Sequence, residues 1–217
     1  MKLGRREFIK FLTTAIAGSQ GWASSEVLRS PRFYADKKLG FGFEIPQGWF
    51  LEAFRDDFDE LLGGQRLAAP YADDREVMLE ASQGLLATLS KYPIEGDPIK
   101  RFSPSMTFFK DSDGCLEEFG DLLGLSSKAI MGFQSLLTDY ECIEEPHLVR
   151  RSDCVMVRSK SKFLFEHQEI RSVLIDDETF VVHHQGSVYT IHLYDSPYSG
   201  DTAQSEFRLF RESLHIA

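Results

Sequence analysis

Hydrophobic and polar residues alternate most regularly in residues 39–50. Large apolar side chains there are separated by small or polar ones, and the apolar positions are Phe41, Phe43 and Ile45. This is the pattern of a half-buried β-strand. Pro46 has no N–H to donate to a neighbouring strand, so the strand is predicted to end there. A turn through Gly48 then reverses the chain, and we expect Trp49 to be buried against the strand.

Short apolar runs that end at turn residues predict further strands. They cover residues 85–92, 105–110, 140–144, 154–165, 169–175, 179–184 and 188–194. Gln185-Gly186 separates the last two and is typical of a tight hairpin. Residues 50–62 mix acidic and apolar side chains, which fits a short helix or an irregular cover on the sheet.

Apolar residues with helical spacing predict helices in two places. The first helix should start at the turn 111–114, and its apolar stripe consists of Leu116, Phe119, Leu122, Leu123, Ile130, Phe133, Leu136 and Leu137. Gly124 interrupts this stripe and Ser126 or Ser127 can cap a new segment, so the pattern fits one broken helix or two in series. A final helix should be capped within 199–202, with an apolar face made of Ala203, Phe207, Phe210 and Leu214.

The order of these elements, with Phe-Gly-Phe-Glu-Ile-Pro-Gln-Gly-Trp over residues 41–49, resembles the PsbP-like family. This family comprises the extrinsic photosystem II proteins and their bacterial relatives. A strand at 188–193 followed by the final helix is similar to the family's C-terminal end, whereas Arg55–Ala81 departs from its pattern. The resemblance implies an α+β fold, with an antiparallel β-sheet sandwiched between helices (PsbP-like α/β/α), over residues 35–217.

Residues 1–23 have the layout of a signal peptide: a basic start, a mildly apolar middle and small residues at the end. The start closely resembles a twin-arginine (Tat) signal. The matching positions are Arg5, Arg6, Phe8, Ile9 and Lys10, while Gly4 stands where Ser or Thr is usual. The apolar run is too short to be a stable membrane anchor. The alternative is a basic amphipathic start to an ordinary helix.

Small residues in Gly21-Trp22-Ala23 predict cleavage between Ala23 and Ser24, and residues 24–34 would then form a linker. A competing cleavage motif, Ala15-Ile16-Ala17, leaves a cramped apolar core. The resemblance to a twin-arginine signal implies that the Tat export machinery carries the folded protein across a membrane. The destination would be the periplasm, or the thylakoid lumen in a photosynthetic organism.

The charge of the mature protein narrows the choice of partners. The chain has 24 Lys and Arg against 34 Asp and Glu, a net charge of −10. The leader has four basic residues and one acidic residue, so it carries +3 and residues 24–217 carry −13. Such an acidic surface is repelled by nucleic acid and by anionic lipid, which argues against both as partners.

The sequence predicts no catalytic, cofactor or metal site. No Ser stands in a Gly-x-Ser-x-Gly elbow, and pairs such as Asp176-Asp177 are typical of a solvated face. If Gln185-Gly186 forms the hairpin, His183 and His192 share a face but lie roughly 13 Å apart, which is too far for one ion.

The 3 cysteines have no metal or haem spacing, and buried or idle thiols are the simplest interpretation. A disulfide between Cys142 and Cys154 is a second hypothesis. A symmetric hairpin would place the two residues opposite each other, and an oxidising compartment lets such a bond persist. Cys115 leaves an odd count.

Two classes of function remain. The first is a non-catalytic exported module that binds or stabilises an unknown protein partner, as the resemblance implies. The second is a small enzyme or a cofactor- or metal-binding protein exported in folded form, although no cofactor motif supports it.

Overall fold

The computed structural model of the chain describes residues 27–30, 33–36, 40–52, 85–93, 102–110, 115–166, 171–197 and 202–216. Within them, seven strands form one antiparallel sheet in the order β4-β5-β6-β10-β9-β8-β7. Their bounds are β4 Phe50–Glu52, β5 Leu85–Ser90, β6 Ser105–Lys110, β7 Glu141–Arg150, β8 Val155–Phe165, β9 Val173–His184 and β10 Ser187–Asp195. A smaller sheet has the order β1-β2-β3-β11, with β1 Val27–Ser30, β2 Phe33–Asp36, β3 Phe41–Glu44 and β11 His215–Ile216.

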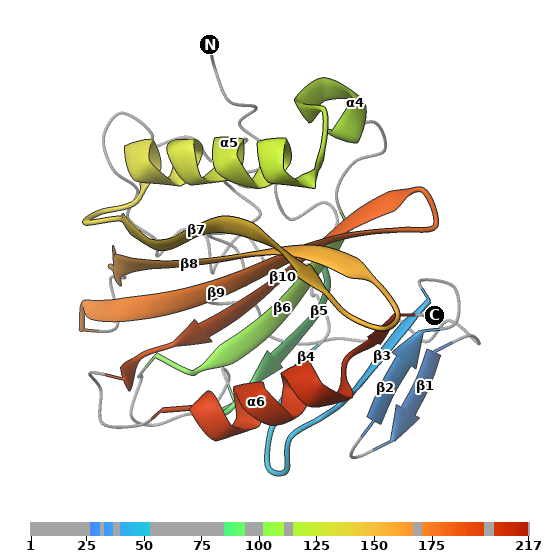
Figure 1. Cartoon of the computed structure of the whole chain (residues 1–217). Helices are drawn as coiled ribbons and strands as arrows, with labels where there is room; N and C mark the ends of the chain where they lie inside the picture. The colour runs from blue at the N-terminus through green and yellow to red at the C-terminus, as the bar shows by residue number, and fades with distance from the viewer. Residues whose placement is uncertain are drawn as a thin grey trace.

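Helices cover both faces of the larger sheet (Figure 1). The short α4 (Cys115–Phe119) and the longer α5 (Leu122–Leu136) lie on one side, where α5 packs on β7, β8 and β9. The C-terminal α6 (Gln204–Ser213) lies on the other side, next to β3. The predicted α+β fold, with its antiparallel sheet between helices, is confirmed.

Stacked aromatic rings fill the core on the α6 side of the sheet. The rings of Phe43 and Phe108 are parallel, with centroids 4.6 Å apart, and Phe210 meets both edge-on from α6. Trp49 is 8% exposed, and its indole contacts Phe207 at 5.9 Å. The prediction that Trp49 is buried is therefore confirmed, as is the predicted apolar face of the last helix.

The α5 side has a smaller apolar core, built from Leu125 of α5 and from Val157, Val181 and Val188 of the sheet. Neighbouring residues of β9 show the alternation, because Phe180 and Val182 belong to the α6-side core and Val181 to the α5-side core. Each long strand therefore contributes to two different interiors.

The predicted hairpin at Gln185-Gly186 is confirmed, with His183 opposite Val188 and His192 opposite Thr179. Both turn residues have positive φ, 49° and 79°, as a type I′ turn requires. The predicted strands ending at 175 and starting at 179 are one strand, β9, because the acidic residues between them lie inside it; residues 169–170 of the first prediction lie outside the described residues. Strand β7 continues past the predicted end at residue 144, through Pro146 and two irregularities in register. Proline is tolerated there because β7 is an edge strand of the sheet, with one side of its backbone not paired to another strand among the described residues.

The break between the two helices in series lies at Gly120, not at the predicted Gly124. Gly120 has φ +86°, and the side chain of Asp121 caps α5 by accepting the N–H of Gly124 at 2.7 Å. The serines at 126 and 127 lie within α5, so neither of them is the cap. Gly124 is needed for a different reason, because a Cβ there would lie 2.4 Å from the carbonyl oxygen of Phe119.

Residues 24–34 were predicted to form a linker. Within them, Val27–Ser30 forms β1, which pairs with β2. The leader with its twin arginines and cleavage site lies outside the described residues, as do 53–84, the helix start 111–114 and three residues of the cap region 199–202.

Candidate functional site

Two rows of polar side chains cross the α5 side of the larger sheet. One row is formed by Thr88, Thr107, His192, Thr179 and Ser159, each opposite the next on the neighbouring strand. The second row is formed by Ser90, Ser105, Tyr194, Asp177 and Ser161. All except Thr179 are buried. An interior face this polar needs a partner for each group, because an unpaired buried hydroxyl costs about 1–3 kcal/mol.

His192 and Asp177 form the charged centre of these rows. The Nδ1 of His192 lies 3.3 Å from both carboxylate oxygens of Asp177 and 3.1 Å from the hydroxyl of Thr179, which donates to Asp177 at 3.0 Å. The imidazole stacks on Tyr194 at 5.3 Å and meets Phe109 edge-on at 6.1 Å. These contacts fix the orientation of the imidazole beside the buried carboxylate.

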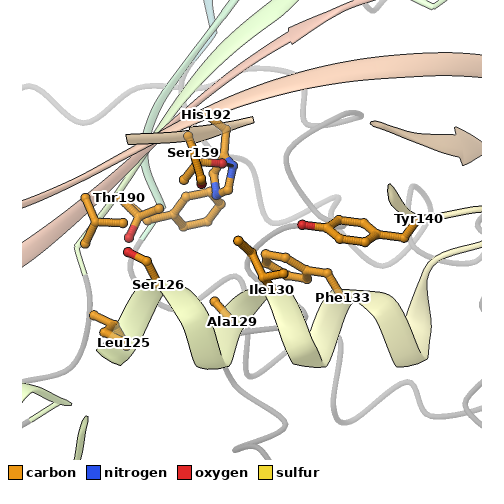
Figure 2. Close-up of a pocket in the computed structure, with 12 residues that line it drawn as sticks. Leu125, Ser126, Ala129, Ile130, Phe133, Tyr140, Ser159, Thr190 and His192 are labelled. Carbon is orange, nitrogen blue, oxygen red and sulfur yellow. Dashed lines mark hydrogen bonds between the residues drawn. The ribbon is translucent and has the colours of Figure 1, made fainter. Parts of the chain in front are cut away.

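A cavity of about 40 Å³ separates this pair from α5. Ser126, Ile130 and Phe133 line it from α5, and Figure 2 shows the Ser126 hydroxyl pointing from the helix towards the sheet. Ser126 is 5% exposed, and its Oγ has no hydrogen-bond partner within the described part of the chain. A nucleophilic serine must lie within hydrogen-bond reach of its base, so the described residues do not assemble a Ser-His-Asp site here.

The opposite face of the sheet carries a larger, open groove of about 500 Å³ beside α6. Its lining combines apolar and charged side chains. The apolar ones include Ile143, Leu193 and Phe207. The charged ones include Arg158, Lys160, Lys162, Arg211, Asp176, Glu178 and Asp195. We call it the α6 groove. Its volume is that of an ordinary ligand pocket.

The basic side chains of the α6 groove form ion pairs with neighbouring carboxylates. Glu178, which is 9% exposed, accepts from Arg158 of β8 and from Arg211 of α6, each at 2.6 Å. Lys160 lies 3.4 Å from Glu144, and Lys162 lies 3.1 Å from Glu141. The Glu178 bridge ties α6 to the sheet, whereas the two lysine pairs lie at an exposed rim and are worth little to stability.

Two aspartates lie opposite each other at one end of the α6 groove, Asp176 on β9 and Asp195 on β10. Asp195 is fully buried and caps the start of α6 by accepting from Ser196 N, Thr202 Oγ1, Ala203 N and Gln204 Nε2. Asp176 is partly exposed. Burial, and then the charge of Asp195, raise the pKa of the Asp176 carboxyl above its usual value.

The predicted disulfide is contradicted by the register of the sheet. Cys142 lies opposite Ser161, and the hairpin turns at 151–154, so Cys142 and Cys154 are separated along the strands by roughly 20 Å. Both thiols are free. Burial raises the pKa of Cys142, and it raises that of Cys154 to about 11, which makes both thiols poor nucleophiles.

The acidic pair Asp176-Asp177 does not form the solvated face that was predicted, since Asp177 is 2% exposed and pairs with His192. Sequence reasoning considered His192 only as a metal ligand and missed this contact. The register given by Gln185-Gly186 already places His192 beside Thr179. The sequence did not show that α5 covers this side of the sheet and so buries the contact. Within the described residues, no group of three or more His, Cys, Asp and Glu side chains is arranged to hold a metal ion.

The comparisons with known proteins concern the fold. No family model matches the chain, and no curated protein sequence matches it. The chain is similar to the solution structure of cyanobacterial PsbP (CyanoP) from Synechocystis sp. PCC 6803, with TM-score 0.51 and 18% identity over 92% of this chain and 98% of that one. A second match is LpqN, described as involved in cell envelope biogenesis of Mycobacterium tuberculosis, with TM-score 0.47 and 12% identity over 82% and 83% of the two chains. The protein therefore has a PsbP-like fold. Its described helices include none with the length and apolar character to cross a membrane.

Proposed function

We propose that this protein is an exported accessory protein without catalytic activity, and that it binds another protein through the α6 groove. The observation that carries the proposal is the groove itself, which is open and has the size of a binding pocket. The buried His192–Asp177 pair lies instead beside a cavity of about 40 Å³, which has little room for a substrate. The PsbP-like fold agrees with this proposal, because the resemblance of the sequence to the PsbP-like family implies a non-catalytic module that binds another protein.

The chemistry of the α6 groove suits a protein partner. Protein interfaces combine an apolar centre with a polar rim, and the groove offers Leu193, Phe207 and the 51% exposed Ile143 beside its ion pairs. The exposed pairs of Lys160 and Lys162 can exchange their carboxylates for those of a partner at little cost.

Binding at the groove is tested with two substitutions in the same strand. Affinity capture from the exporting organism supplies the partner, and its affinity is then measured with purified proteins. Ile143→Ser should weaken binding about tenfold, whereas Leu148→Ser should not, because Leu148 is 50% exposed on β7 but lies outside the groove. Equal affinities of both variants and the wild type would exclude the groove as the interface.

Export would depend on the leader. The Tat export machinery should recognise Arg5 and Arg6, and cleavage after Ala23 should release the mature protein into the periplasm, or into the thylakoid lumen of a photosynthetic organism. Replacing both arginines with lysine should leave uncleaved precursor in the cytoplasm. Normal export of that variant would refute the twin-arginine assignment.

A second candidate function is a small enzyme or cofactor carrier, which the buried, oriented His192–Asp177 pair favours. Ultraviolet–visible spectra and metal analysis of the purified mature protein separate the two candidates. A chromophore or a stoichiometric metal would support the second, and a colourless, metal-free protein that binds its partner would support the first.

A further inference from the structure

We propose that the α6 groove binds a cationic side chain, lysine or arginine, of the partner protein, and that Asp176 is the carboxylate that receives it. This inference rests on the proposed function, because it names the chemistry by which the partner would be recognised.

Most charged side chains of the α6 groove are paired with one another or with neighbours. Its four basic residues each have a carboxylate: Arg158 and Arg211 share Glu178, Lys160 has Glu144, and Lys162 has Glu141. Asp195 is held by backbone and side-chain donors that are neutral. With Asp177, the lining has four acidic and four basic residues, and Glu141 and Glu144 add two carboxylates beside it, so the groove and its rim together carry a surplus negative charge.

Asp176 is where this surplus lies. Its carboxylate lines the groove, and within the described part of the chain it makes no hydrogen bond or ion pair. Lys162 lies opposite it on β8, but the Nζ of Lys162 is 3.1 Å from Glu141. The charges that act on Asp176 are those of Asp195, which disfavours its ionised form, and of Lys162 and Lys160, which favour it.

An ionised Asp176 in this place reduces stability. Its raised pKa means that the folded state binds the proton more tightly than the unfolded state, so its contribution to stability is greatest at low pH and is lost as the pH rises. A carboxylate whose ionised form lowers the stability of the fold, and which lies in an open groove, is typical of a functional site. A partner's ammonium or guanidinium group would relieve the repulsion from Asp195.

Size and long-range charge point to the same occupant. The groove, at about 500 Å³, admits a long side chain with its neighbours, and Phe207 and Leu193 can contact the aliphatic stem. The charge of −13 on residues 24–217 attracts a cationic partner and raises its rate of association.

The inference is tested first without the partner. L-Arginine amide is titrated into ¹⁵N-labelled mature protein at low ionic strength, and the amide shifts of the groove strands are followed. Residues around Asp176 should shift with a saturable profile in the wild type. The response should be lost in Asp176→Asn and kept in Glu212→Gln, a change on α6 outside the groove lining. Identical titrations of all three proteins would overturn the proposal.

The partner and the stability of the variants supply the second test. Asp176→Asn should weaken partner binding at least tenfold, with a smaller salt dependence, while its urea midpoint equals or exceeds that of the wild type. A lowered midpoint would show that Asp176 serves the fold. If Asp176→Asn binds the partner normally while Ile143→Ser does not, the cation site is wrong and the proposed function stands. If neither change affects binding, both are wrong.

Discussion

Asp195 offers the sharpest test of how this fold is held together, because one carboxylate joins the last strand of the large sheet to the last helix. It is fully buried at the end of β10 and lies at the start of α6, whose N-cap residue, Ala203, makes no side-chain capping bond. The donors are two backbone N–H groups, of Ser196 and Ala203, and the side chains of Thr202 and Gln204, at 2.7–3.1 Å.

The expected magnitude follows from what each substitution leaves unpaired. Asp195→Ala removes all acceptors and leaves two N–H groups without a partner, so we expect a loss of about 3–5 kcal/mol at roughly 1.5 kcal/mol or more for each bond to a charged group. Asp195→Asn keeps the Oδ1 that serves the backbone, and Thr202 and Gln204 can rotate to accept from the new amide. Its loss should be about 1–2 kcal/mol.

The assay is urea denaturation followed by fluorescence and circular dichroism on the mature protein. With a slope of about 2 kcal/mol per molar urea, the alanine variant should shift the midpoint by about 1.5–2.5 M. Asp121→Ala is the matched control, since Asp121 caps α5 at an exposed site through one bond to Gly124 N and should cost about 1 kcal/mol. Equal losses for the two alanine variants would refute the claim that burial and multiple donors make Asp195 the stronger cap.

Three further predictions concern single side chains. Trp49→Ala should cost about 3–5 kcal/mol, because the indole is 8% exposed against Phe207, and an unchanged urea midpoint would contradict its burial. Gly124→Ala should destabilise by about 1–3 kcal/mol, since the new Cβ would meet the carbonyl of Phe119 at 2.4 Å; a gain of stability, as at an ordinary helical glycine, would contradict it. Cys154, whose pKa burial raises to about 11, should react with iodoacetamide at pH 8 about a hundredfold more slowly than a thiol of pKa 9, and the rate in urea is the reference.

Most strands of the fold could be predicted from the sequence because their signals are local. Alternation identified β3 through Phe41 and Phe43, and a turn whose residues both have positive φ fixed the register of β9 against β10. Helix α6 was also predictable, since Phe207 and Phe210 repeat on the face that the sheet covers.

The candidate sites could not be predicted, because they depend on what covers each face. Polar residues that alternate with apolar ones in a strand are normally read as facing solvent, yet here the polar residues Thr107, Asp177 and His192 are buried. Asp177 and His192 meet within the β9–β10 hairpin, whose register was predictable, but the cover by α5 that buries them was not. The raised pKa of Asp176 depends on its burial and then on the charge of Asp195, which the start of α6 holds in place.

The consecutive residues Asp176, Asp177 and Glu178 explain why these acids lie inside a strand although acidic residues disfavour strands. Alternation sends Asp177 to the α5 side, where His192 and Thr179 receive it, and sends the other two to the α6 groove, where Glu178 bridges Arg158 and Arg211. A shift of β9 by one residue would bury Asp176 and Glu178 beneath α5 and move Asp177 away from His192. Each misplaced buried charge would cost several kcal/mol, so the acids penalise this shifted register. Among the described residues, the same alternation leaves Asp176 in the groove without a partner, so the binding chemistry proposed for this protein depends on the pairing of its strands.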